Sequence, residues 1–211
     1  MKVVTINGSN NKKGNTAQSL KLVTNELVSE GIEVIDIVIG KEMFHQCTGC
    51  GYCSRMKNEE CVFKDDKLNE IYQQIKDCDG LLLGSPVHYA GLSGTMKTML
   101  DRLIVMVGAN KNPLRLKVGA SVAAVRRSGG IPAINEMNEF LAYCEMIIPS
   151  SNYWTVIHGS EEGEVLKDTE GCQIMRVLGK NMAYTLKVLD YSKGHIKKPE
   201  KEKKIWMNFI R

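Results

Sequence analysis

Residues 1–16, MKVVTINGSNNKKGNT, set the fold class, because a short apolar run leads through a glycine- and asparagine-containing loop into a helical pattern. Residues 3–6 are rich in β-branched side chains and are bounded by Gly8-Ser9, so they predict a buried strand. Residues 16–29 carry apolar side chains at helical spacing and predict a helix. A strand, a loop and a helix in this order form the repeating unit of parallel α/β sheets.

The same alternation continues along the chain. Further strands are predicted at residues 32–39, 80–84, 117–125 and, for the fifth, 146–148 with 153–156. Further helices are predicted at residues 66–76, 95–107, 131–144 and 174–189. The pattern predicts an α/β fold with a doubly wound five-stranded parallel sheet in the flavodoxin-like order 2-1-3-4-5. We expect one domain over residues 1–211, with a cysteine-rich insertion at about 43–65, after the second strand.

Composition excludes several classes of protein. The 211 residues include 28 Lys and Arg against 24 Asp and Glu, a net charge of +4, so no nucleic-acid partner is expected. No apolar run approaches the ~18 residues of a membrane span, and the first residues turn too early for a secretory signal. We therefore expect a cytoplasmic protein with no membrane partner. The lysine-rich tail, about 193–211, predicts a solvated end, and its apolar residues could pack on the domain or on a second subunit: Ile205, Trp206, Phe209 and Ile210.

Three loops rich in glycine, serine or asparagine follow the first, third and fourth strands, at residues 8–15, 86–94 and 126–130. Ligands of doubly wound sheets bind at the carboxyl ends of the strands, where these loops should meet. The first loop enters a helix whose initial amides are unpaired, and Ser9, Asn15 and Thr16 add further donors. This suits a phosphomonoester; an ordinary turn capped by Asn15 or Thr16 is the alternative. The loop matches neither the Walker A motif nor the dinucleotide fingerprint.

Residues 84–97, GSPVHYAGLSGTMK, are the most specific stretch outside the cysteines. Pro86 stiffens the exit from the strand, and the glycines permit close approach of the backbone to a flat ligand. Tyr89 offers a ring that could border such a ligand. His88 could hold a proton, although a loop histidine is more often a surface or packing residue. No triad of catalytic side chains is evident, so a bound cofactor is expected to carry the chemistry.

Four of the seven cysteines form the pattern C-x2-C-x2-C-x7-C at Cys47, Cys50, Cys53 and Cys61. Thiolates at this spacing can turn inward on one metal centre, and three of them with a fourth nearby suit a [4Fe–4S] cluster. Zinc is the competing metal, while free thiols or a redox-active pair are the metal-free alternatives. The insertion leaves the sheet at the same edge as the three loops. The two sites could therefore exchange electrons within a subunit or across a dimer interface.

Two separated motifs, Gly8-Ser9 with Gly14-Asn15-Thr16, and residues 85–94 followed by Lys97 and Asp101-Arg102, resemble those of the NADPH-dependent FMN reductase family. The resemblance covers residues 1 to about 150. The cysteine spacing resembles that of the iron–sulfur flavoproteins, a branch of the same family. Proteins of that branch are homo-oligomers that carry FMN and a [4Fe–4S] cluster in each subunit.

The resemblance implies a flavodoxin-like fold and places FMN on the three loops. The phosphate would be held by the first loop, through Ser9, Asn10, Gly14, Asn15 and Thr16. The isoalloxazine ring would be lined by the second loop, through Pro86, Val87, His88, Tyr89, Ala90 and Gly91. The third loop would add Arg126, Ser128 and Gly129. Arg126 and Arg127 stand where family members often carry small or hydroxyl residues, and could meet the NADPH phosphate, the flavin or solvent.

We therefore expect a flavin-dependent oxidoreductase that transfers electrons between NAD(P)H or ferredoxin and an acceptor, through a [4Fe–4S] cluster held by the four cysteines. NAD(P)H would be a co-substrate, and ferredoxin or another redox protein a partner. The chain is expected to form a homodimer or homotetramer. The alternatives are an FMN-binding electron carrier without a small-molecule substrate, a cluster-free FMN reductase, and a flavin-free sensor.

Overall fold

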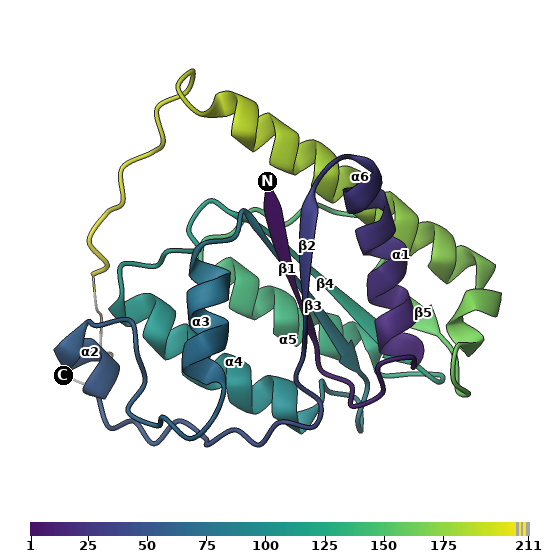
Figure 1. The fold of residues 1–211 in the computed structure, drawn as a ribbon, viewed down its shortest axis with the longest axis horizontal. Coiled ribbons are helices and arrows are strands. Elements are labelled where there is room, and N and C mark those ends of the chain that lie inside the picture. Colours follow the sequence, from purple (N-terminus) through teal and green to yellow (C-terminus); the bar gives the residue numbers. More distant parts are fainter. Residues whose placement is uncertain (206, 208, 210–211) are drawn as a thin grey trace.

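The computed structural model describes residues 1–205, 207 and 209, and it contains the predicted parallel sheet (Figure 1). The strands are β1 (Lys2–Asn7), β2 (Glu33–Val38), β3 (Gly80–Pro86), β4 (Val118–Val125) and β5 (Val156–His158). They pair in parallel in the order β2-β1-β3-β4-β5, which confirms the predicted topology. All carboxyl ends therefore lie at one edge of the sheet.

Helices cover both faces of the sheet, with the strands between the two layers (Figure 1). They are α1 (Asn15–Ser29), α2 (Tyr52–Met56), α3 (Leu68–Lys76), α4 (Gly94–Ala109), α5 (Gly130–Tyr143) and α6 (Thr169–Ser192), with a 3-10 turn at Glu164–Lys167. Helices α1 and α6 bury their apolar sides against one face, together with Val3, Leu82 and Val122. Helices α3, α4 and α5 pack on the opposite face. Alternate strand residues thus feed two separate cores, as expected of strands buried on both sides.

The fifth strand begins later than predicted, and only its first residue, Val156, falls within the predicted ranges 146–148 and 153–156. Ile147 makes only an isolated bridge with Val118, and the paired strand begins at Val156, opposite Ala123. Pro149 and the polar residues after it interrupt the first apolar piece. The strand is only three residues long, which is common for an edge strand.

Helix α6 begins five residues before the predicted start. Apolar periodicity begins at Ile174, but Asp168 accepts a hydrogen bond from the Gly171 amide and caps the helix. The signal that was missed is therefore the N-cap aspartate followed by Thr169 and Glu170.

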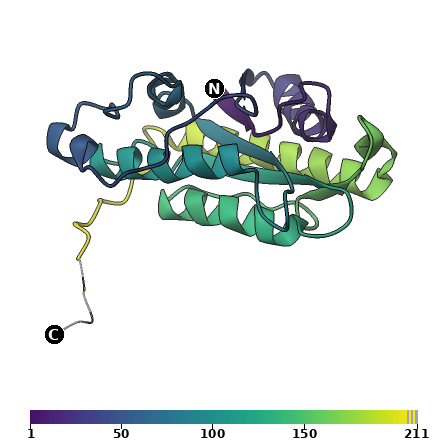
Figure 2. The ribbon, with the colours of Figure 1, turned by 90° about the horizontal axis from the view of Figure 1, so that it is seen from below.

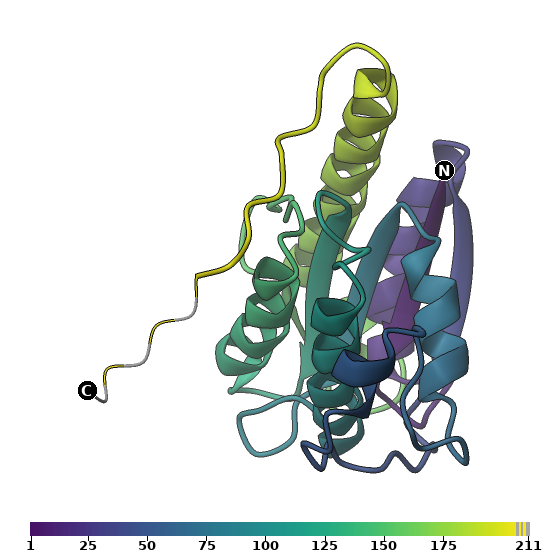
Figure 3. The ribbon, with the colours of Figure 1, turned by 90° about the vertical axis from the view of Figure 1, so that its left-hand side faces the viewer.

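The lysine-rich segment after α6 is exposed, and Figures 2 and 3 show it extending away from the sheet and its helices. Arg115 holds it by donating to the carbonyl oxygens of Pro199 (3.0 Å) and Glu200 (3.4 Å). Ile205 and Phe209 are 90% and 91% exposed, so these two do not pack on the domain. Trp206 and Ile210 lie outside the described residues. Across the described part of the chain, no helix combines the length and apolarity needed to cross a bilayer.

Candidate cofactor sites

The three loops predicted to bind the flavin meet at the carboxyl edge of the sheet, and hydrogen bonds join them. The Gly8 amide donates to the Gly84 carbonyl at 2.8 Å, and Ser93 Oγ donates to the Gly8 carbonyl at 3.2 Å. The Val87 amide donates to the Ala124 carbonyl at 3.1 Å. The backbone of the sheet and its loops therefore sets the geometry of this edge.

The first loop is shaped by its own side chains. Asn7 Oδ1 accepts from the Ser9 amide at 2.9 Å, Ser9 Oγ accepts from the Asn11 amide at 3.2 Å, and Asn11 Oδ1 accepts from the Lys13 amide at 2.9 Å. These turns are the local structures that serine and asparagine favour outside helices. Ser9 and Asn10 are thus held in a defined loop.

Helix α1 begins with free donors. Its N-cap is Gly14, and no side chain caps it, so the alternative of an ordinary turn capped by Asn15 or Thr16 is wrong. Asn15 Oδ1 instead accepts from the Val165 amide at 3.4 Å. Within the described residues, the amides of Asn15, Thr16 and Ala17 have no acceptor, and the first turn holds no acidic side chain. Unpaired amides at a helix start fit a phosphate group.

The loop after β3 ends in a tight hairpin. His88 and Gly91 exchange backbone hydrogen bonds of 2.9 and 3.0 Å, which places Tyr89 and Ala90 at the tip. Both tip residues have positive φ, 48° and 65°. Such conformations cost non-glycine residues roughly 1–3 kcal/mol and persist where the surroundings impose them. The Tyr89 ring is fully exposed at the loop that the resemblance assigns to the flavin ring.

The loops after β3 and β4 touch at Gly129. A Cβ atom there would lie 2.7 Å from Ala90 Cα and 3.0 Å from Val87 Cγ1, and its φ is +90°. Glycine is thus required both by the close approach and by the backbone conformation. Arg126 and Arg127 beside it are exposed, and neither guanidinium has a partner among the described residues.

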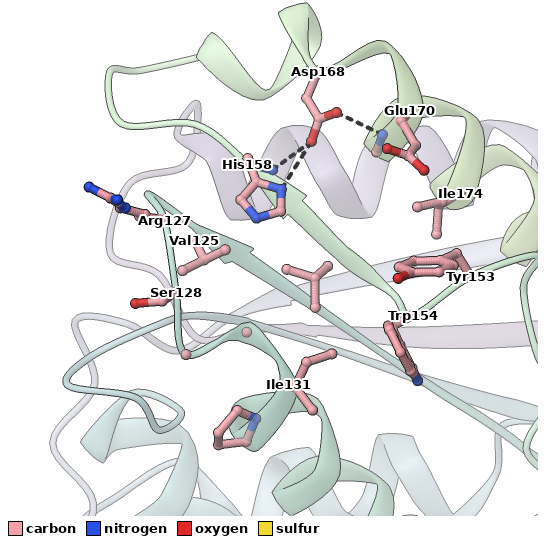
Figure 4. Close-up of a pocket in the computed structure, with 15 residues that line it drawn as sticks. Val125, Arg127, Ser128, Ile131, Tyr153, Trp154, His158, Asp168, Glu170 and Ile174 are labelled. Carbon is pink, nitrogen blue, oxygen red and sulfur yellow. Dashed lines mark hydrogen bonds and ion pairs between the residues drawn. The ribbon is translucent and has the colours of Figure 1, made fainter.

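A pocket of about 480 Å³ opens beside the third loop, between the starts of α5 and α6 and next to β5 (Figure 4). Ser128 and Gly129, two residues assigned to the flavin, also line it, together with Arg127. Sequence reasoning missed its aromatic wall, where Tyr153 and Trp154 pack edge to face with centroids 4.5 Å apart. These residues follow no motif, and the irregular segment before β5 is what brings them here.

Asp168 and His158 line the same pocket, and Figure 4 shows them paired. Asp168 Oδ2 accepts from the His158 amide at 2.8 Å and lies 3.4 Å from His158 Nδ1. Burial acts to raise the pKa of Asp168, but hydrogen bonds from the amides of Gly171 and His158 outweigh it and lower that pKa. The carboxylate is thereby held ionised as the cap of α6.

The four cysteines of the motif line a second pocket, of about 260 Å³, beside α4. Cys53 is buried and Cys61 half-buried, whereas Cys47 and Cys50 are exposed. Across the described residues, no three His, Cys, Asp or Glu side chains converge closely enough to hold one metal ion. The thiols therefore line one pocket but do not converge on a single metal position. A pocket ringed by four cysteine donors fits the ligand chemistry of an iron–sulfur cluster.

Local backbone structure places Cys50 and Cys53 in different surroundings. Gly51, in a left-handed conformation, precedes the short helix α2, and Arg55 of that helix donates to the Cys50 carbonyl at 2.8 Å. A hydrogen bond from the Tyr52 amide lowers the pKa of the Cys50 thiol, whereas burial raises the pKa of Cys53. The two thiols therefore differ in readiness to form a thiolate in the metal-free chain.

Comparisons with known proteins agree with this geometry. The family model described as NADPH-dependent FMN reductase matches residues 1–161. An iron–sulfur flavoprotein of Methanocaldococcus jannaschii is 32% identical over 202 residues, 90% of this chain and 99% of the relative. A second one from that organism is 30% identical over 92% of this chain and all of the relative.

Solved structures share the fold. RosB, with a bound riboflavin-phosphate intermediate, superposes with a TM-score of 0.68 at 13% identity, covering 100% of this chain and 92% of RosB. An archaeal flavodoxin superposes with a TM-score of 0.58 at 17% identity, covering 89% of this chain and 99% of the flavodoxin. The match to the family model over most of the chain, together with the relatives aligned over nearly their full length, carries the assignment. The chain belongs to the NADPH-dependent FMN reductase family, in its iron–sulfur flavoprotein branch.

Proposed function

We propose that this flavin oxidoreductase passes electrons between NAD(P)H or ferredoxin and an acceptor by way of FMN and a [4Fe–4S] cluster. The observation that carries the proposal is that all four motif cysteines line one pocket of a chain from a flavin-binding family. The residues of the two sites, and the partners, are part of the proposal.

On the flavin side, the chain binds and orients. The unpaired amides of Asn15 and Thr16, with Ser9 and its loop, would hold the phosphate. The hairpin at residues 86–91 and the glycine that it contacts, Gly129, would present backbone to the ring. When bound, FMN supplies hydride and single-electron chemistry that amino-acid side chains lack.

On the cluster side, Cys53 and Cys61 would form the inner wall and Cys47 and Cys50 the outer wall, as their burial indicates. When bound, the cluster supplies single-electron transfer. Two exposed ligands would leave the site within reach of a second subunit or of a redox protein such as ferredoxin. This supports a homodimer or homotetramer as the working assembly.

The pocket beside the third loop is our proposed site for the NAD(P)H co-substrate. It shares Ser128 and Gly129 with the flavin loop, and it offers an aromatic wall. Arg127 lines it, whereas the neighbouring Arg126 does not, and neither has a partner in the described chain. Arg127 is therefore placed to bind a phosphate of the co-substrate.

Steady-state oxidation of NADPH and NADH by the anaerobic protein, with an artificial acceptor, tests this function. We expect turnover, and we expect Arg127→Gln to raise the KM for NADPH about tenfold, the effect of losing ~1.4 kcal/mol of a charge-assisted contact. Arg176→Gln, at an exposed arginine of α6 that does not line the pocket, is the matched control and should leave KM unchanged. Flavin that is reduced by ferredoxin but not by either nucleotide would favour the electron carrier without a small-molecule substrate.

A further inference from the structure

One buried arginine of α4 faces the cysteine pocket. Arg102 is only 2% exposed, and its Nη2 donates to Cys61 Sγ at 3.0 Å. Its Nη1 donates to the carboxylate of Asp66 and to the carbonyl oxygen of His45 at 3.2 Å. A single guanidinium therefore bonds to residue 45, before the first cysteine of the motif, to the last cysteine, Cys61, and to residue 66 beyond it.

The charges around this group are fixed in place. Arginine stays protonated in proteins, and Asp66, whose side chain is also 2% exposed, supplies the opposite charge. Asp66 also accepts from the amides of His45 and Leu68, both at 3.1 Å. The guanidinium lies 5.2 Å from the centre of the Phe63 ring, which stacks on the His45 ring. The arginine therefore has little freedom to turn away from Cys61.

The guanidinium also has an unused donor. Its Nε–H is buried and has no acceptor among the described residues. Buried donors in native proteins nearly always find a partner. Arg102 thus has one more hydrogen-bond donor than the described chain satisfies. Sulfur ligands of an iron–sulfur cluster accept such bonds.

We propose that Arg102 is a positioning residue that orients Cys61 as a cluster ligand and raises the reduction potential of the cluster, an inference that rests on the proposed function. Reduction by one electron adds negative charge at the cysteine pocket. A positive charge and a hydrogen bond at a ligand sulfur stabilise that reduced form. The carboxylate of Asp66 acts in the opposite direction, so the pair Arg102–Asp66 sets the potential together.

The test compares Arg102→Gln, Arg102→Lys and Asp66→Asn with the wild type, each purified anaerobically as the holoprotein. Iron and sulfide content is measured first, and the cluster potential is then measured by redox titration followed by electron paramagnetic resonance. Arg102→Gln should lower the reduced-to-oxidised ratio about tenfold at a fixed solution potential, which equals 59 mV for one electron. Asp66→Asn should shift the ratio in the opposite direction. Arg102→Lys keeps the positive charge but lacks the planar set of guanidinium donors. Its reduced-to-oxidised ratio should lie between those of the wild type and Arg102→Gln.

Lys57→Gln is the matched control, because Lys57 is an exposed cation of the same insertion and does not line the cysteine pocket. The cluster potential of this control variant should match that of the wild type. A wild type without iron overturns the proposed function and this inference with it. Loaded variants with unchanged potentials, or with Arg102→Gln and Asp66→Asn shifted in the same direction, overturn the inference alone. Loss of the cluster from all three variants together with a clearly lower urea midpoint of unfolding also overturns it, since Arg102 would then act only in folding the insertion.

Discussion

The carboxyl edge of the sheet formed by residues 8–15, 86–94 and 126–130, where we propose that FMN binds and which we call the flavin edge, and the cysteine insertion are built in different ways. At the flavin edge, backbone hydrogen bonds such as that between Gly8 and Gly84 join the loops, and side chains act locally, within the first loop and from Ser93 to Gly8. The insertion contains only the short helix α2, and side chains from α3 and α4 hold it. Asn69 accepts from the Cys61 amide at 2.7 Å, and Asn110 accepts from the Glu59 amide at 3.1 Å. The flavin edge should therefore be sensitive to added atoms, and the insertion to deleted ones.

The largest effect should follow from removing a buried thiol of the insertion. Cys53→Ala takes one of the four sulfurs from the pocket, so we expect nearly all iron and sulfide to be lost while FMN is retained. Iron, sulfide and flavin assays on one anaerobic sample measure this. Cys172→Ala, at a buried cysteine on α6, is the control and should keep the cluster. Equal loss of FMN in Cys53→Ala would show that the two sites are not built separately.

An added methyl group should damage the flavin edge. At Gly40, where the chain leaves β2 for the insertion, a Cβ would lie 2.1 Å from backbone atoms of Ser9 and Asn10. Gly40→Ala must push the loop at residues 8–15 aside, at a cost of typically 1–3 kcal/mol, so, if this loop holds the phosphate as proposed, FMN should bind about tenfold more weakly. Fluorescence titration of the flavin-free protein measures this. Gly108→Ala, on α4, where a Cβ meets nothing within 4 Å, should bind FMN normally.

A deleted side chain should damage the insertion more than the flavin edge. Asn69 accepts from the Cys61 amide and donates to the carbonyls of Cys61 and Phe63, at 3.3 and 3.0 Å. Asn69→Ala should cost about 2 kcal/mol, because the Cys61 amide loses its acceptor in a half-buried site. Urea unfolding and the rate of iron loss measure the effect. Asn58→Ala, at an exposed asparagine of the same insertion, should change neither.

The smallest effect concerns the cap of α6. The lowered pKa of Asp168 means that its carboxylate stabilises the fold above the unfolded value, near 3.9, and that this stabilisation is lost as pH falls through the folded value. Asp168→Asn keeps a capping side chain but loses the charge at the helix start. At pH 7 the free energy of unfolding of the wild type should exceed that of the variant by up to about 1 kcal/mol. Urea unfolding at decreasing pH should show the difference shrinking; a constant difference would contradict the titration of Asp168.

The two regions also differ in how far the sequence predicts them. Apolar periodicity predicted the strands and helices of the sheet, and the glycine-rich motifs located the three loops that meet at its carboxyl edge, because each of these signals depends on neighbouring residues. The cysteine motif named the thiols, but not Arg102 and Asp66, which are 36 residues apart and meet only through the fold. The aromatic pocket at Tyr153 and Trp154 was not predicted from the sequence for the same reason. The cap at Gly14 was missed because a glycine cap has no side-chain signal.

The central claim is that a flavin and a four-iron cluster occupy the same chain. The measurement that tests it most directly is an absorption spectrum of the anaerobically purified protein, with iron and acid-labile sulfide assayed on the same sample. Flavin bands with a broad shoulder near ~400 nm, and about four iron and four sulfide per chain, are the predicted result. Flavin bands without iron would contradict it, leaving an FMN reductase whose motif cysteines are free thiols or zinc ligands.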